Sequence, residues 1–267
     1  MMIRATLISL CAIFAALPAA AQQLPPGVES ARLLPGWTDA DGNRISALEL
    51  RLEPGWKTYW RNPGDSGLPP SFEWQESDNL AKISFHWPAP EAIRSGDELT
   101  LGYHNLLVLP FTAEPVDPAH PVELAASIDL GVCEKICVPA HLDLQAPAAA
   151  VDPDPEIEAA LARVPEPLSL RPSCTRRDIS DGIQLDVLLP RQDIDVAAME
   201  LEDHPEIWVS TATLDPEGTG TRATADFVPP SGKAFDLDVT DLRITLIGAD
   251  GTVEMRGCDL QGTASAG

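Results

Sequence analysis

Short runs of alternating apolar and polar residues recur along this chain and predict β-strands. The clearest run covers residues 122–132, where the even positions are apolar and Ser127 and Asp129 lie between them. The same alternation resumes over 138–145. A period of two is typical of strands with one buried face, and a three-residue connection between two such strands predicts a hairpin. Further strands are predicted in the first half of the chain at 30–35, 45–52, 82–87 and 106–112.

The second half of the chain repeats this organisation after a proline-rich interruption. Residues 146–155 have the composition of a linker, and 156–164 have the apolar spacing of a short helix that Pro165 ends. Strand patterns then follow at 168–175, 182–189, 197–202, 206–214, 222–228, 235–247 and 252–259.

Many short strands separated by 26 prolines and 18 glycines predict an all-β protein. We expect one β-sandwich followed by a second, smaller β-sandwich. The second sandwich contains no catalytic constellation and is expected to be structural and to dock partners. The predicted organisation is a signal peptide at 1–21, a first sandwich at 22–147, a linker with a short helix at 148–165, a second sandwich at 166–262 and a disordered tail at 263–267.

The first 21 residues have the features of a secretory signal peptide. Arg4 precedes an apolar stretch from Ala5 to Leu17, and an A-x-A site predicts cleavage after Ala21. The stretch is too short to span a bilayer comfortably, and no later segment reaches the required run of about 18–20 apolar residues. We therefore expect a soluble mature chain without a transmembrane segment in the periplasm, an oxidising compartment.

The charge balance narrows the range of partners. The formal net charge is −23 at pH 7, which argues against nucleic acid and against anionic membrane surfaces. An ordinary solvated acidic surface, without any specific partner, explains the same net charge. The sequence also contains no glycine-rich phosphate loop and no nucleophile elbow, so neither a hydrolase nor a cofactor is expected.

Four cysteines remain once the signal peptide is removed, namely Cys133, Cys137, Cys174 and Cys258. An even number in an exported chain predicts two disulfides. Three pairings are possible, and the spacing favours 133–137 with 174–258. In the chain-entropy model the short loop contributes only about 2 kcal/mol and the long loop about 4.6 kcal/mol. The long bridge is therefore interpreted as a structural staple and the short one as a redox-active pair, with an ordinary hairpin disulfide as the alternative.

The phase of the predicted hairpin places Cys133 and Cys137 side by side on its outer face, away from the core. A bulge at Gly131 would reverse that phase. Lys135 in the turn favours a thiolate slightly, and Glu134 opposes it. No helix N-terminus is predicted near either sulfur, so we expect the reactivity of the pair to be controlled by its partner.

A cluster of aromatic and basic residues precedes a turn signal in the first half. The cluster comprises Trp56, Tyr59, Trp60 and Arg61, and the turn follows at 62–65. Two interpretations are open. These side chains could form a surface that recognises a partner, or Trp56 and Trp60 could share one strand face and fill the core, with Tyr59 opposite.

Several of these motifs also occur together in one family. The chain contains, in order, Gly55-Trp56-Lys57-Thr58-Tyr59-Trp60-Arg61 with Pro63-Gly64-Asp65, then Trp87-Pro88-Ala89-Pro90, then Gly102-Tyr103, and then Cys133 with Cys137-Val138-Pro139. Over about residues 30–145 it resembles the N-terminal periplasmic domain of the DsbD/ScsB thiol:disulfide interchange proteins, and the ScsB branch most closely.

The resemblance implies an immunoglobulin-like sandwich with a redox pair at Cys133 and Cys137, of which Cys137 is the attacking residue. It implies electron transfer from a membrane-embedded domain to periplasmic thioredoxin-like proteins. It also places a cap loop over the cysteines at 97–104, with Tyr103 and His104 as the shielding residues.

Two departures from the family pattern change these expectations. Family members continue into a membrane domain and a thioredoxin-like domain, which these 267 residues do not contain. A separate membrane protein is therefore the expected electron donor. The cysteines have three intervening residues here and five in DsbD, which leaves the client proteins open.

The link of the ScsB branch to copper tolerance leaves a second function open. Reduced Cys133 and Cys137 are soft ligands that suit Cu(I), and His104 and His141 are candidate neighbours. No dense Met/His tract is present, so no resident metal is expected. A non-catalytic interaction protein with two structural disulfides is the third possibility.

Overall fold

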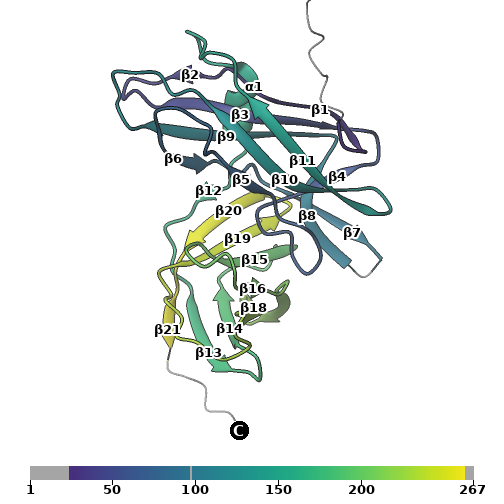
Figure 1. Ribbon diagram of the computed structural model, residues 1–267. Coiled ribbons are helices and arrows are strands. Elements are labelled where there is room, and N and C mark those ends of the chain that lie inside the picture. The colour runs from purple at the N-terminus through teal and green to yellow at the C-terminus, as the bar shows by residue number, and fades with distance from the viewer. Residues whose placement is uncertain (1–23, 97, 262–267) are drawn as a thin grey trace, which may run out of the picture.

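The computed structural model describes residues 24–96 and 98–261, which form two β-sandwiches connected by one short helix (Figure 1). The predicted signal peptide and C-terminal tail lie outside the described residues. Within the described part of the chain, strands pair either among residues 28–145 or among residues 166–261, and no strand pair joins the two sets. The predicted all-β class is confirmed.

The N-terminal sandwich consists of two antiparallel sheets, as expected of an immunoglobulin-like arrangement. Its strands are β1 (Val28–Leu33), β2 (Trp37–Thr38), β3 (Arg44–Leu52), β4 (Lys57–Tyr59), β5 (Ser71–Glu73), β6 (Leu80–Phe85), β7 (Glu91–Ser95), β8 (Glu98–His104), β9 (Leu106–Pro115), β10 (Ala125–Cys133) and β11 (Cys137–Gln145). One sheet has the order β1-β3-β9-β6, with β2 beside β3. The other has the order β11-β10-β4-β8-β7, with β5 beside β10.

Alternate residues of both sheets meet in a single hydrophobic core. Ile128 and Leu130 of β10 contribute from one sheet and Phe111 of β9 from the other, and Trp60 is completely buried among them. Because successive side chains of a strand point to opposite faces, the odd positions of β10 face outward. This packing fixes the register of β10 and β11, whose connecting turn is the candidate site.

The C-terminal sandwich contains both antiparallel and parallel pairs. Its strands are β12 (Glu166–Pro167), β13 (Ser173–Asp178), β14 (Ile183–Leu189), β15 (Val196–Leu201), β16 (Trp208–Val209), β17 (Thr213–Glu217), β18 (Gly220–Val228), β19 (Leu242–Gly248), β20 (Gly251–Arg256) and β21 (Asp259–Gln261). One sheet has the order β12-β20-β19-β15, and the other β16-β18-β14-β13-β21, with β17 beside β18. Parallel pairing joins β12 to β20 and β13 to β21. The predicted strand at 235–247 begins only at Leu242.

The connection between the sandwiches is packed rather than free. Helix α1 (Pro155–Leu161) begins at Asp154, whose side chain accepts hydrogen bonds from the backbone N–H groups of Glu156 and Ile157. Ile157 is fully buried against the first sheet. The helix is three residues shorter at its end than predicted, because a proline at 165 disfavours the helical conformation of the residue before it.

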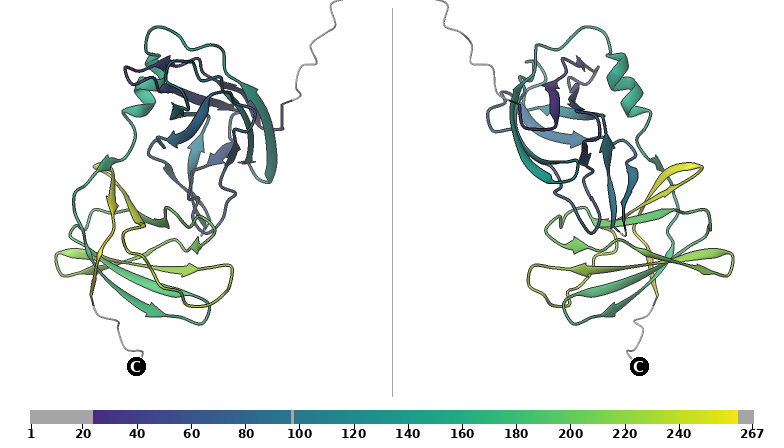
Figure 2. Two further views of the ribbon diagram at one scale, coloured as in Figure 1. Left: turned by 60° about the vertical axis from the view of Figure 1, so that its left-hand side comes forward. Right: turned by 90° about the vertical axis from the view of Figure 1, so that its right-hand side faces the viewer.

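The two sandwiches lie directly against one another (Figure 2). Strand β15 packs against the cores of both. Val196 and Ala198 pack into the N-terminal core, while Ala197 and Met199 pack into the C-terminal core. Both faces of β15 are therefore buried. None of the helices among the described residues has the length and apolar character needed to cross a membrane.

Candidate functional site at the β10–β11 hairpin

A disulfide closes the β10–β11 hairpin at its turn. Cys133 and Cys137 are directly paired in the strand register, with a Cα–Cα distance of 4.2 Å, and their sulfurs are bonded. The register is continuous through Gly131, which pairs with Pro139, so no bulge changes the phase. The cysteines accordingly lie on the face opposite to inward-facing Val132.

The two sulfur-bearing residues differ in exposure. Cys137 is exposed, but Cys133 is only 2 % exposed. Both cysteines therefore lie on the outer face of the hairpin, as predicted, but Cys133 is covered there. Its cover is the ring of Tyr59, because β4 pairs with β10 and carries that side chain across the outer face of the hairpin.

Tyr59 contacts both sulfur atoms of the bridge. Its hydroxyl oxygen lies 2.8 Å from the Sγ of Cys133 and 3.0 Å from the Sγ of Cys137. Two glycines make room for the ring, since a Cβ atom would lie 2.9 Å from it at Gly131 and 2.7–2.8 Å from the ring and Pro63 at Gly67. Burial, and then the nearby charge of Glu98, raise the pKa of Tyr59. The phenol therefore stays protonated at neutral pH and can donate a hydrogen bond to sulfur.

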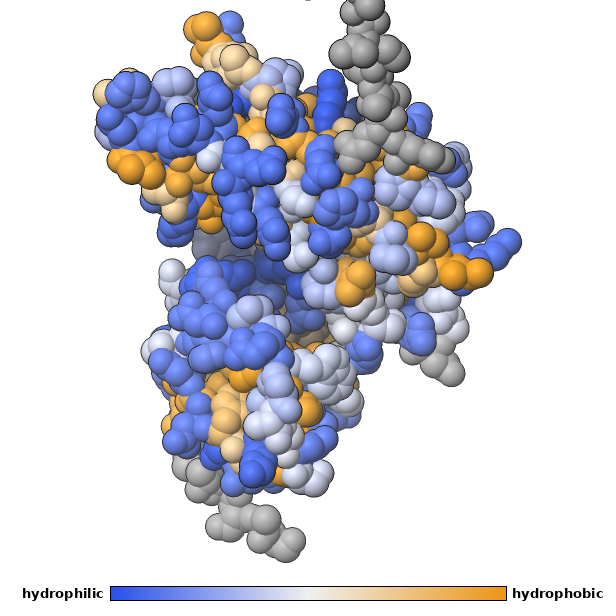
Figure 3. Space-filling view, in the orientation of Figure 1, coloured by the Kyte–Doolittle hydropathy of each residue, from blue (hydrophilic) through white to orange (hydrophobic). Residues whose placement is uncertain are grey.

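Basic and apolar side chains surround this bridge. Lys57 of β4 is the cross-strand neighbour of Cys133, and His104 of β8 is the next residue in the same row. Ile136 in the turn is 75 % exposed, and Leu68 beside Gly131 is 50 % exposed. In Figure 3, apolar surface is visible at the right-hand edge, where the hairpin ends. The site is thus a half-open disulfide with a cation beside it and exposed apolar residues at its rim.

The predicted cap loop at 97–104 is wrong in its conformation. Glu98–His104 form strand β8, paired with β4 and β7. Tyr103 points into the core, where its hydroxyl donates a hydrogen bond to the carbonyl oxygen of Pro88. His104 lies at the surface and pairs with Glu91 at 2.8 Å. The apolar residues of β8 alternate, which is the signal for a strand, and the aromatic residue that covers the cysteines is Tyr59.

The aromatic and basic cluster does not form one recognition surface. Trp60 fills the core, and the half-buried Trp56 packs against Gly27. Arg61 points to the C-terminal sandwich, where it forms ion pairs of 2.7 Å with Glu200 and with Glu254. Tyr59 alone of the four reaches the disulfide. The interpretation in which Trp56 and Trp60 fill the core with Tyr59 opposite therefore holds for Trp60 and Tyr59, whereas Trp56 only packs against the edge of the core.

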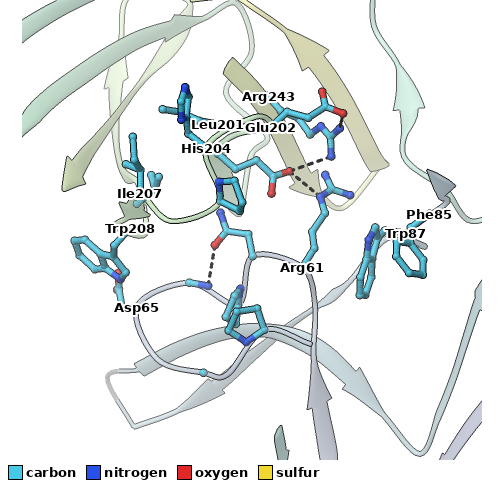
Figure 4. A pocket seen from close by; sticks show the side chains of 18 of the residues that line it. Arg61, Asp65, Phe85, Trp87, Leu201, Glu202, His204, Ile207, Trp208 and Arg243 are labelled. Carbon is cyan, nitrogen blue, oxygen red and sulfur yellow. Dashed lines mark hydrogen bonds and ion pairs between the residues drawn. The ribbon is translucent and has the colours of Figure 1, made fainter. Parts of the chain in front are cut away.

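A cleft of about 700 Å³ lies between the two sandwiches, behind the segment that follows Tyr59 (Figure 4). The cleft is visible as a hollow in the space-filling view (Figure 3). Its aromatic lining comes from Phe85 and Trp87 on one side and Trp208 on the other. Arg243, like Arg61, is engaged by glutamates of the C-terminal sandwich. The cationic lining of the cleft is thus already paired.

The second disulfide has a different environment. Cys174 at the start of β13 is bonded to Cys258 just before β21, across 84 positions of sequence. Both residues are buried in the C-terminal core. The predicted pairing of 174 with 258 is the one that the structure contains.

The histidines named as candidate copper ligands lie apart. His104 is on β8 and His141 on β11, where its ring nitrogens pair with Asp129 and Asp143. The hydrogen bond to Asp129 is the main reason that the pKa of His141 is raised. Among the described residues, no group of three or more His, Cys, Asp or Glu side chains has the arrangement of a metal site.

Comparison with known proteins identifies the class of the first sandwich. Residues 30–149 match the family "Thiol:disulfide interchange protein DsbD, N-terminal". The N-terminal sandwich is therefore a domain of the DsbD N-terminal family.

The whole fold has a counterpart among solved structures. The crystal structure of the N-terminal periplasmic domain of ScsB from Proteus mirabilis is similar, with a TM-score of 0.61 and 23% sequence identity over 87% of this chain and 92% of that one. Both sandwiches are thus shared, although at this identity the likeness concerns the fold alone. No curated protein gives a significant match to the chain.

Proposed function

We propose that this protein exchanges disulfides with thioredoxin-like partners in the periplasm through Cys133 and Cys137. The observation that carries the proposal is the half-open bridge with the Tyr59 hydroxyl against both sulfurs, at the turn of the hairpin. Membership of the first sandwich in a thiol:disulfide interchange family supports it. So does the periplasmic setting named for the similar ScsB domain.

The difference in exposure between the two cysteines supports the following order of steps. In the reduced protein the Cys137 thiolate attacks one sulfur of the partner's disulfide, and the other partner sulfur leaves as a thiolate. The Cys133 thiolate then attacks the Cys137 sulfur of the mixed disulfide, which re-forms the intramolecular bridge and releases the partner as a dithiol. Two electrons pass to the partner, and its two thiolates take up two protons from solvent. A membrane protein is the proposed source of the electrons that restore the Cys133 and Cys137 thiols.

Local groups support both thiolates. Lys57 is the cross-strand neighbour of Cys133 and provides a positive charge on the same face. The protonated Tyr59 hydroxyl can donate to either sulfur when it becomes a thiolate. No helix N-terminus takes part among the described residues, so the site differs from a thioredoxin motif in how it is activated.

Trapping experiments test the exchange and its direction. Cys133→Ala leaves the exposed cysteine and should accumulate a mixed disulfide with an oxidised thioredoxin-like protein. Cys137→Ala leaves only the buried cysteine and should trap about tenfold less, because burial limits attack. The measurement is non-reducing electrophoresis with mass mapping. Absence of any trapped species in both variants would contradict the proposed exchange.

A further inference from the structure

The segment that shields the disulfide also contacts the C-terminal sandwich. We define the shield segment as residues 61–68, which follow Tyr59 of β4 and the buried Trp60. On its hairpin side, Leu68 and the Tyr59 ring lie against Gly131, and Tyr59 reaches both sulfurs. Gly67 belongs to the same segment and lies against the other side of the Tyr59 ring. The ring therefore cannot leave the sulfurs freely unless the segment moves with it.

Five polar interactions attach the shield segment to the other sandwich. The Arg61 guanidinium forms ion pairs of 2.7 Å with Glu200 of β15 and with Glu254 of β20, and it donates a hydrogen bond of 3.3 Å to the hydroxyl of Thr245. The Asn62 side chain donates a hydrogen bond of 2.9 Å to the carbonyl oxygen of Met199. Asp65 accepts one of 2.6 Å from the backbone N–H of Thr211. Each of these partners lies in the C-terminal sandwich.

The ion pairs of Arg61 are largely shielded from solvent. The Arg61 side chain is only 13% exposed, and the side chains of Glu200 and Glu254 are 17% and 19% exposed. The guanidinium also lies 4.1 Å from the centre of the Trp60 ring. Partly buried, charge-assisted pairs of this kind are stronger than pairs in open solvent.

Space for movement exists on the side of the segment away from the disulfide. Residues 61–65 line the cleft of about 700 Å³ between the sandwiches (Figure 4). A displacement of the segment into this cleft breaks these five interactions and the hydrogen bond from the Leu101 N–H to the Pro63 carbonyl oxygen, while Trp60 stays in the N-terminal core. Gly67 then leaves the Tyr59 ring, and the Tyr59 side chain can turn away from the sulfurs. The attachments to the C-terminal sandwich therefore help to hold the segment over the ring.

We propose that the C-terminal sandwich controls access to Cys133 by holding the shield segment over it, with Arg61 as the positioning residue. This deepens the proposed function by assigning the second sandwich a regulatory role at that site. Loosening the contact between the sandwiches uncovers Cys133. Tightening the contact keeps Cys133 covered, while Cys137 stays open to partners.

The test measures uncovering directly through the alkylation of Cys133. In a Cys137→Ala background with the Cys174–Cys258 bridge oxidised, Cys133 is the one free thiol of the described residues. Adding Arg61→Gln should accelerate alkylation by iodoacetamide about tenfold, which corresponds to about 1.4 kcal/mol. Glu200→Gln with Glu254→Gln should act similarly from the other sandwich, and combining both sets should add little further.

Matched controls separate positioning from general destabilisation. Arg222→Gln removes an exposed ion pair with Glu217 and should leave the alkylation rate unchanged. Arg61→Lys keeps the positive charge. Its alkylation rate should lie between those of Arg61→Gln and the parent. Reduction of the Cys174–Cys258 bridge should be unaffected by all of these changes. An increase below twofold in both the Arg61 and the glutamate variants, or an equal increase in Arg222→Gln, would overturn the proposal.

The outcome is independent of the proposed exchange with thioredoxin-like proteins. Alkylation involves no protein partner, so failure of the trapping experiment leaves this test intact. Conversely, a normal trapping result with unchanged alkylation would reject control by the second sandwich and leave the exchange function standing.

Discussion

The N-terminal sandwich contains the Cys133–Cys137 disulfide and the C-terminal sandwich contains the Cys174–Cys258 disulfide. The two bridges differ in the length of the loop that they close and in how far their cysteines are buried. The first closes a hairpin turn over four positions of sequence and leaves Cys137 exposed, whereas the second spans 84 positions with both residues buried. Loop length sets what a bridge contributes to stability, and exposure sets how readily it reacts. Comparing the two bridges within one chain therefore separates a staple from an exchangeable pair.

The largest difference is expected in stability. Cys174→Ala/Cys258→Ala should lower the free energy of unfolding of the C-terminal sandwich by about 4 kcal/mol, because the bridge constrains a long loop in the unfolded chain. Cys133→Ala/Cys137→Ala should cost only about 2 kcal/mol. Thermal unfolding of both double variants under oxidising conditions measures this. A larger loss for the hairpin pair would reverse the assignment of staple and reactive bridge.

Reduction by a small dithiol should show the opposite order. We expect dithiothreitol to reduce Cys133–Cys137 at least about 100-fold faster than Cys174–Cys258 in the folded protein, since attack requires access to a sulfur. Quenched-flow alkylation followed by peptide mass mapping gives both rates in one sample. Equal rates in the absence of denaturant would show that burial does not distinguish the bridges.

The Tyr59 hydroxyl should account for part of the reactivity of the hairpin bridge. Tyr59→Phe keeps the ring but removes the donor, and we expect reduction by dithiothreitol to slow about tenfold because the departing thiolate loses a hydrogen bond to a charged atom. The control is Tyr103→Phe, whose hydroxyl binds Pro88 and reaches neither sulfur. A rate for Tyr59→Phe equal to the parent would mean that the hydroxyl only fills space.

A smaller effect is expected on the pH dependence of the free energy of unfolding. This dependence distinguishes a buried ion pair from an exposed one. Hydrogen bonds from Arg32, and then from Arg51, lower the pKa of the buried Glu49 carboxyl to about 2. Because the folded pKa lies below the ordinary value, the stabilisation is present above pH 4.5 or so and is lost as the pH falls toward 2. The raised pKa of Glu156, which hydrogen bonds to Glu49, offsets part of it.

Glu49→Gln should therefore reduce the slope of stability against pH between about 4.5 and 2, by about 1 kcal/mol over the range. A hydrogen bond from Arg191 also lowers the pKa of Asp193, but the Asp193 side chain is 48% exposed and solvent screens the pair, so Asp193→Asn is the matched control and should change the slope less. Urea unfolding at several pH values measures both slopes. An equal change in the two variants would show that burial of Glu49 contributes nothing.

The sequence predicted the hairpin and the phase of its cysteines well, because one strand face is buried and the alternation over 122–132 reports that face directly. It did not predict that Cys133 is covered. The cover comes from Tyr59 on β4, a three-residue strand too short to show a period. Two glycines at 131 and 67 make the space for its ring, and nothing local indicates that they face the same side chain.

Strand β15 and strand β8 show two other limits of the sequence. Strand β15 has hardly any alternation, because both of its faces are buried by different sandwiches. The family resemblance predicts a loop where strand β8 lies, although Leu99, Leu101 and Tyr103 alternate with polar and small residues. The interdomain ion pairs of Arg61 join positions far apart in sequence, and no local pattern encodes them.

Because both faces of β15 are buried, the two sandwiches cannot be produced as separate fragments without exposing apolar surface. A fragment that ends before residue 166 loses Val196 and Ala198 from its core and exposes the apolar side chains they covered, including Leu99 and Leu101. Uncovered apolar surface of this kind promotes self-association. An isolated N-terminal fragment is thus expected to be less soluble than the whole chain, and replacing Leu99 with a polar residue is the first change to try when such a fragment is prepared.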